Sequence, residues 1–198
     1  MSIHTGKICS KAFYGLYKIC QLRKFLNPES TKTLVHAFVT SHLDYCNCLL
    51  FGLPKYLIDR LQKVLNAAAR LIFRIPKFDH ISPTLFHLNW LPVAYRVHFK
   101  LLLLVYKSLN NQGPQYIQEY FQPYSVTGHD LHSSDQGLLK IPRTNFKTFG
   151  DCAFAHSGPF LCNKLPREIW NSESVVIFKS KLKTYLFKLA YNLLSHFK

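Results

Sequence analysis

An apolar stripe between Lys55 and Ile75 constrains the fold of this chain more than any other feature of the sequence. On a helical wheel its apolar side chains fall within an arc of about 120°. They are Leu57, Leu61, Val64, Leu65, Ala68, Leu71, Ile72 and Ile75. A helix with such a face is stable only when another element covers it, so the stripe predicts a helix packed into a core. Gly52 and Pro54 before the stripe and Pro76 after it predict where this helix begins and ends.

The same predicted helix carries cations on a separate arc. Arg60, Lys63, Arg70 and Arg74 fall within about 80° of the wheel, and no apolar position of the stripe lies in that arc. Lysines and arginines on a helix often form only a solvated face, which requires no ligand. The alternative is a ridge that contacts the phosphates of a nucleic acid. The pattern of this helix alone leaves both interpretations open.

The charge of the whole chain bears on this choice. There are 25 Lys and Arg against 10 Asp and Glu, a formal net charge of +15. This excess favours a polyanionic partner, and we expect RNA or DNA, with an anionic membrane surface as the second candidate. The longest apolar run, from Leu101 to Tyr106, is far shorter than the ~20 residues of a membrane span. Without an apolar signal segment, we expect an intracellular protein, nuclear or cytoplasmic, with reduced cysteines.

Amphipathic patterns along the chain predict a mainly α protein with about seven helices. We expect helices over Ile8–Leu26, from Asn27 to Gly52, over Lys55–Ile75, from Ser82 to Trp90, from Pro92 to Leu109, over residues 148–163 and from Ser174 onward. Asn27 should cap the second helix, because Pro28 follows at the first helical position.

A change of composition separates two groups of predicted helices. Pro, Ser, Gly and Asp accumulate between residues 122 and 147, where the only extended run is Leu138 to Ile141. This composition predicts an irregular or β-hairpin insertion. We therefore expect a helical domain over residues 1–121, the insertion over residues 122–147 and a C-terminal helical subdomain over residues 148–198.

Patterns that indicate catalysis or metal binding are weak. Two-metal nucleotidyl transfer requires converging carboxylates, whereas no two of the 10 acids adjoin in the sequence. There is no phosphate-binding glycine loop and no Gly-x-Ser-x-Gly nucleophile motif. A zinc pattern can be written from His129, His132, Cys152 and His156, but it lacks the paired cysteine knuckles of strong zinc sites. We therefore expect no catalytic residue, no metal and no cofactor.

Cationic and aromatic residues interleave in the segments KAFYGLYKICQLRKF, YRVHFKLLLLVYK and FKSKLKTYLFK. Cations neutralise phosphates and exposed rings stack on bases, so this mixture is typical of nucleic-acid-binding surfaces. At helical spacing the rings are alternatively core residues beside solvated cations. The residues expected to contact phosphates are Arg60, Lys63, Arg70, Arg74, Arg96, Lys100, Lys179 and Lys183.

Several motifs in a fixed order resemble one protein family. They are TKTLVHAFVTSHLDYCNCLLFGLP, LQKVLNAAARLI, HISPTLFHLNWLPVAYRVHFK, LHSS, and GPFLCNKLPREI with FKSKLKTYLF. From about Ile8 to Tyr191 the series is similar to the region downstream of the polymerase core in LINE-type, non-LTR retrotransposon reverse transcriptases of the jockey-like group. The resemblance implies a helical region that helps to hold template RNA and target DNA. It also implies a fragment without catalytic activity, because the endonuclease and polymerase parts of that family are not in this sequence.

The chain departs from the family pattern at five positions. His42, His132, Cys152 and Trp170 stand where the pattern has arginine, and Cys162 stands where it has tryptophan. Arginine changes to His, Cys or Trp when cytosine is deaminated, so one hypothesis is a decayed element copy with no retained function. Another is a helical protein-interaction module whose apolar faces dock on a polymerase domain.

Overall fold

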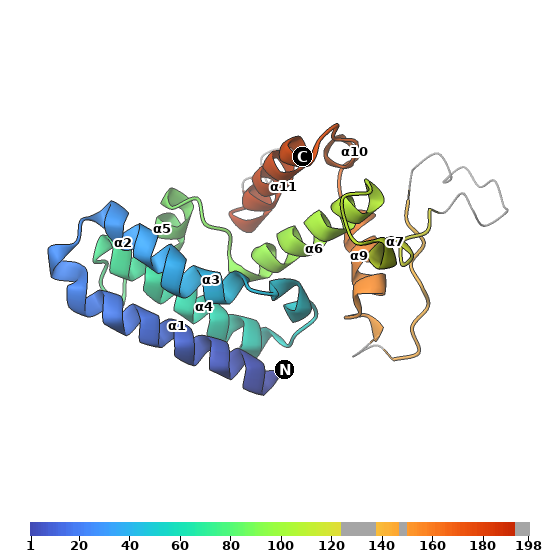
Figure 1. Cartoon of the computed structure of the whole chain (residues 1–198). Helices are drawn as coiled ribbons and strands as arrows, with labels where there is room; N and C mark the ends of the chain where they lie inside the picture. Colours follow the sequence, from blue (N-terminus) through green and yellow to red (C-terminus); the bar gives the residue numbers. More distant parts are fainter. Residues whose placement is uncertain (124–137, 147–149, 193–198) are drawn as a thin grey trace. The chain divides into compact units, whose positions relative to one another are not determined.

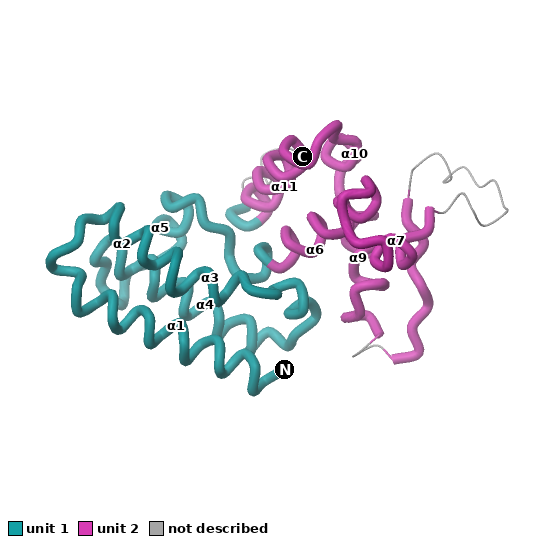
Figure 2. Tube along the Cα trace, viewed as in Figure 1, with its two compact units in different colours: residues 1–96, 190–193 teal, residues 97–189, 194–198 magenta. Residues whose placement is uncertain are grey.

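The structure, a computed structural model, describes residues 1–123, 138–146 and 150–192 (Figure 1). These residues are mainly helical and form no sheet, which confirms the predicted fold class. They divide into two compact units, the first comprising residues 1–96 with 190–193 and the second residues 97–189 (Figure 2). The chain passes from the first unit to the second within helix α6 (Val93–Leu109), and the domain boundaries expected at residues 121 and 147 stay a prediction.

Three helical segments lie side by side in the first unit (Figure 1). In chain order they are α1 (Ser2–Leu22), a middle segment that comprises α2 (Pro28–Val35), the π-helix η2 (His36–Thr40) and α3 (Ser41–Asp44), and α4 (Lys55–Phe73). Helix α1 packs against both of the others. The face that α4 buries contains Leu57, Leu61, Val64, Leu65, Ala68, Ala69 and Ile72. The predicted stripe is therefore the core face of α4, although Leu71 and Ile75 at its end are half-buried.

Local signals set several helix boundaries. Asn27 caps α2 as predicted, since its Oδ1 accepts a hydrogen bond of 2.7 Å from the backbone N–H of Ser30. Helix α4 ends at Phe73, because its C-cap residue Arg74 adopts a left-handed conformation with φ of 54°. Helix α5 (Ser82–His87) and helix α6 lie where the sequence predicts them.

The second predicted helix is wrong at its C-terminal end. It was expected to continue to Gly52, but α3 ends at Asp44 and Cys46 is left-handed, with φ of 49°. A 3-10 turn, η3 (Asn47–Leu50), follows. The helix cannot continue because Tyr45 is extended and Cys46 is left-handed, and Asp44, the last residue of α3, pairs with the distant Arg96 at 2.8 Å.

Helix α1 and the middle segment approach each other closely at Gly15. A Cβ atom at this position would lie 2.9 Å from the backbone oxygen of Phe38 in η2. Glycine is required here because any side chain would push the two helices apart.

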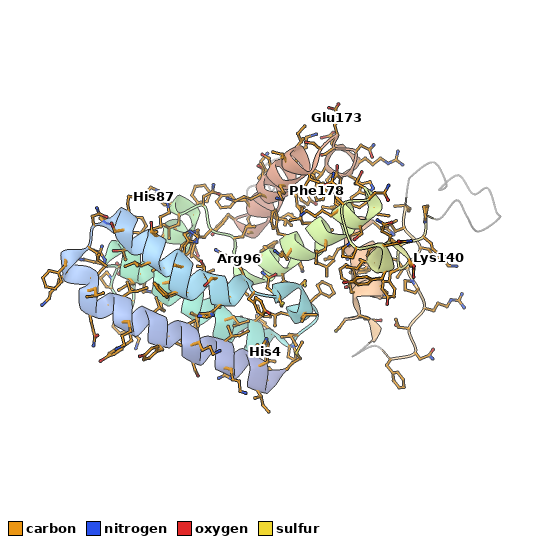
Figure 3. All side chains as sticks on the ribbon, in the orientation of Figure 1. His4, His87, Arg96, Lys140, Glu173 and Phe178 are labelled. Carbon is orange, nitrogen blue, oxygen red and sulfur yellow. The ribbon has the colours of Figure 1, made fainter. Side chains whose placement is uncertain are left out.

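The second unit packs around an aromatic cluster. Besides most of α6, it contains α7 (Gln115–Gln118), α9 (Phe154–Cys162), α10 (Arg167–Trp170) and α11 (Val175–Ala190). The ring of Phe178, which is labelled in Figure 3, stacks on Tyr106 with centroids 3.9 Å apart. Trp170 lies edge-on to both rings. Helix α7 was not predicted from the sequence.

The described part of the predicted insertion has little regular structure. Leu139 forms an isolated antiparallel bridge with Pro123, and the side-chain amide of Asn163 bonds to both the N–H and the carbonyl of Leu139 at 3.0 and 2.9 Å. The predicted hairpin would also involve residues 124–137, and these lie outside the described residues.

Candidate nucleic-acid interface

A shallow groove of about 610 Å³ lies between the C-terminal ends of α1 and α4 in the first unit. Its cationic lining residues are Arg23, Lys24, Arg70 and Arg74, and its other lining residues are Cys20, Ala67, Leu71 and Ile75. No carboxylate lines this groove, and within residues 1–123 none of these four cations forms an ion pair with Asp or Glu. Positive charge is therefore concentrated among the lining residues, none of which is acidic.

Arg23 forms the fixed part of the groove. It is only 8% exposed, and its Nε and Nη2 donate hydrogen bonds of 2.9 and 2.7 Å to the carbonyls of Leu71 and Ile72. Its Nη1 donates a third bond, of 2.7 Å, to the carbonyl of Leu26. The carbonyls of the last helical turn have no partner within the helix and carry its negative dipole end. Arg23 therefore caps α4 from the 3-10 turn η1 (Arg23–Phe25) that follows α1.

Two further arginines of α4 and its C-cap are held by backbone oxygens. Arg74 Nη2 donates to the carbonyl of Arg23 at 3.2 Å. Arg70 donates from Nε and Nη2 to the carbonyls of Pro76 and Asp79, at 3.3 and 3.0 Å. Carbonyl acceptors orient a guanidinium but do not neutralise it, and each guanidinium has more donors than these bonds use. Both arginines can therefore bind an additional anion without first breaking a salt bridge.

Three of the four cations predicted to share an arc lie within α4, and the fourth, Arg74, is its left-handed C-cap residue. Arg60, Lys63 and Arg74 are exposed, whereas Arg70 is half-buried. Arg70 and Arg74 line the groove, and Arg60 and Lys63 lie on the same helix nearer its N-terminus. Positive charge thus extends along α4 from the groove.

Arg96, which is labelled in Figure 3, has a different environment from the other residues of the predicted site. Its Nη1 pairs with Asp44 at 2.8 Å, its Nε donates to the carbonyl of Leu91 at 2.9 Å, and its guanidinium lies 5.7 Å from the ring centroid of Trp90. These contacts give Arg96 a structural role within the first unit. We therefore do not include it in the interface.

The other residues of the predicted site lie in the second unit. Lys100 on α6 and Lys179 and Lys183 on α11 are exposed. Lys179 and Lys183 are one helical turn apart, so they share a face of α11. None of the three lines the groove of the first unit.

Sequence reasoning missed Arg23 and Lys24 as site residues. A signal for Arg23 was available, because it lies four residues after Ile19 and seven after Leu16, in line with the buried face of α1. A charged residue at a core position is rare unless its charge is bonded. Lys24 carries no such signal, since it is exposed and belongs to the groove only through packing of α1 against α4.

The three segments in which cations and aromatics interleave separate into two kinds. In the second and third segments, Tyr106 and Phe178 are 3% and 0% exposed, so their rings are core residues. In the first segment, by contrast, Tyr14, Tyr17 and Phe25 are exposed. Only the first segment therefore presents an aromatic surface of the type that the nucleic-acid interpretation requires.

Neither a metal-binding cluster nor a membrane-spanning helix is present among the described residues. Across residues 1–123, 138–146 and 150–192, no group of three or more His, Cys, Asp or Glu side chains is arranged to hold a metal ion. Over these same ranges, every helix is too short or too polar to cross a lipid bilayer. His129 and His132 of the possible zinc pattern, and Ser133 and Ser134 of the LHSS motif, lie outside the described residues.

No protein-family model, no curated protein and no solved structure matches the chain.

Proposed function

We propose that this chain is a non-catalytic helical region that binds the phosphate backbone of RNA or DNA. The observation that carries the proposal is the groove that Arg23, Lys24, Arg70 and Arg74 line, with no acidic residue among its lining residues. Like charges brought together in a fold repel one another, so such a cluster favours an anion that neutralises it.

The geometry of the groove suits phosphate. Its arginines are oriented by backbone carbonyls before any ligand arrives, which lowers the entropy lost on binding. A guanidinium donates paired hydrogen bonds to two oxygens of a phosphate, and Lys24 adds a mobile point charge.

The remaining cations of α4 extend the site in one direction. Arg60 and Arg74 are separated by roughly 21 Å along the helix axis, at ~1.5 Å per residue. This length spans several phosphates of one strand. A nucleic-acid strand can therefore contact the groove together with Lys63 and Arg60, whereas a single small anion would occupy only the groove.

The family resemblance supports the same function. A region downstream of a LINE-type polymerase core would hold template RNA or target DNA beside an active site on another part of the protein, and it would act inside the cell. The alternative is a helical module that docks on a polymerase domain, and the observation that favours it is the exposure of large apolar side chains such as Ile3 and Phe78, at 78% and 93%.

Salt dependence of binding tests the proposal. The anisotropy of a labelled 20-nucleotide RNA, and of the DNA of the same sequence, is titrated with the full chain at several salt concentrations. With about four phosphate contacts, the slope of log affinity against log salt is expected to be about −3, so affinity falls roughly 60-fold between about 50 and 200 mM. Binding that is absent at the lowest salt, or that does not change with salt, refutes the proposal and favours the protein-docking alternative.

A further inference from the structure

The outward face of α1 presents aromatic rings to solvent. Tyr14 is 63% exposed, Tyr17 is 59% exposed and Phe25, in the turn that follows, is 76% exposed. These rings are not required for the core of the first unit, since the buried face of α1 consists of other residues, Thr5, Ile8, Cys9, Ala12, Leu16 and Ile19. Clusters of exposed apolar side chains on soluble proteins commonly mark binding surfaces.

Lysines alternate with these rings on the same face. On a helical wheel, Lys7, Tyr14, Tyr17 and Lys18 fall within an arc of about 100° that is opposite the buried positions. The Nζ of Lys18 lies 5.5 Å from the ring centroid of Tyr14. The face therefore combines positive charge with flat apolar surface at helical spacing.

The charge of this face indicates the chemistry of its partner. Residues 1–28 contain no Asp or Glu, and the first acid of the chain is Glu29. A purely apolar protein surface would leave the lysines without partners. A nucleic acid supplies both kinds of group that the face requires, phosphates for the lysines and bases for the rings.

The face is continuous with the cationic groove. Lys24 lines the groove and its Nζ lies 4.8 Å from the ring centroid of Phe25. Cys20, on α1 between Tyr17 and Lys24, also lines the groove. A strand whose phosphates occupy the groove can therefore place its bases against the rings of α1.

We propose that the rings of Tyr14, Tyr17 and Phe25 stack on unpaired bases, so that the chain binds single-stranded nucleic acid in preference to duplex. This inference rests on the proposed function, because the groove binds the phosphates of the same strand. In a duplex each base is stacked between its neighbours, and exposing its face costs unstacking energy. Stacking on α1 should therefore give single strands a higher binding affinity than duplexes. Phosphate contacts alone would not produce this difference, because both ligands carry phosphates.

The test compares a 20-nucleotide single strand with its duplex at one salt concentration, using the full chain. In the double variant Tyr14→Leu/Tyr17→Leu, leucine keeps the helix propensity and apolar character but removes the rings. The matched control is Tyr116→Leu/Tyr120→Leu, which removes two tyrosines that are 66% and 56% exposed in the second unit.

The wild-type chain is expected to bind the single strand at least tenfold more tightly than the duplex. The Tyr14/Tyr17 variant should lose roughly tenfold or more in single-strand affinity, with its duplex affinity and salt slope unchanged. The control variant should change neither affinity. Phe25→Leu, in a different turn, should weaken single-strand binding by itself and so provides an independent test.

The outcomes also distinguish this inference from the proposed function. Salt-dependent binding that is equal for both nucleic acids, or that is insensitive to all three ring substitutions, overturns the stacking inference and leaves the phosphate proposal standing. In that case the face of α1 is assigned to a protein partner. Absence of binding to either nucleic acid at low salt overturns both.

Discussion

Replacing Arg23 with methionine should destabilise the first unit strongly, although the sequence did not identify Arg23 as a functional residue. Methionine keeps much of the length of the side chain but has no donor for the three carbonyls that Arg23 bonds. The last turn of α4 would lose its cap, and the turn η1 would lose its attachment to that helix.

The magnitude follows from the burial of each bond. The bond to Ile72 is buried, so its carbonyl would remain without a partner at a cost of about 1–3 kcal/mol. The bonds to Leu71 and Leu26 are only partly buried, so water can replace the arginine and each loss costs about 0.5–1 kcal/mol. The expected loss in the free energy of unfolding is therefore about 2–5 kcal/mol, a large share of the stability of a small domain.

Tryptophan fluorescence during urea unfolding measures this loss in one unit at a time. The chain has 2 tryptophans, with Trp90 buried in the first unit and Trp170 in the second. In a Trp170→Phe background, Trp90 alone reports the first unit. Lys24→Met is the matched control, because Lys24 is adjacent and exposed, and its effect should stay within about 0.5 kcal/mol. If Arg23→Met and Lys24→Met unfold at the same urea concentration, Arg23 does not cap α4.

Three further predictions concern packing and protonation. Gly15→Ala should destabilise the first unit by about 1–3 kcal/mol, because its Cβ would meet the Phe38 oxygen at 2.9 Å. Gly6→Ala in the same helix, with no atom within 4 Å, should stabilise it by about 1 kcal/mol, and urea midpoints that shift alike would contradict both. Cys162 lines a cavity of about 130 Å³, so Cys162→Trp should raise the stability of the second unit by about 1 kcal/mol, and a lower urea midpoint would show that the ring does not fit. Burial and the charge of Lys164 lower the pKa of His98, so stability should be complete above the ordinary pKa of about 6.5 and fall as the pH decreases below it. His98→Gln should reduce this fall in the midpoint, and an identical pH dependence in both proteins would exclude His98 as its source.

The sequence predicts those parts of the fold that depend on local spacing. The core face of α4 follows from its apolar period, and the cap at Asn27 follows from the residue types at the start of α2. Prediction was wrong at the end of α3, where the apolar period continues through Leu49 but the helix does not. The π-helix η2 changes the phase of that period, and the pairing of Asp44 with Arg96 joins residues far apart in the sequence. Neither effect is visible in a local pattern.

The candidate site shows the same limit. Arg70 follows from the helical wheel because α4 positions it, and Arg74 is close to it as the C-cap residue of the same helix. The groove also requires Arg23 and Lys24, which lie more than forty residues earlier and reach it only because α1 packs on α4. Arg96 shows the converse, since its position on a basic amphipathic helix does not reveal that Asp44 and Trp90 hold its charge inside the first unit.

The most direct test of nucleic-acid binding by the groove is the salt slope of a variant that removes two groove cations. In Lys24→Gln/Arg74→Gln the slope for a single-stranded RNA should decrease in magnitude by about 1.4, at ~0.7 per lost phosphate contact. Lys140→Gln/Arg143→Gln removes the same charge from two exposed residues of the second unit, where Lys140 is labelled in Figure 3, and should leave the slope unchanged. Equal reductions in both variants would contradict the account, because they would show that binding depends on net charge and not on the groove.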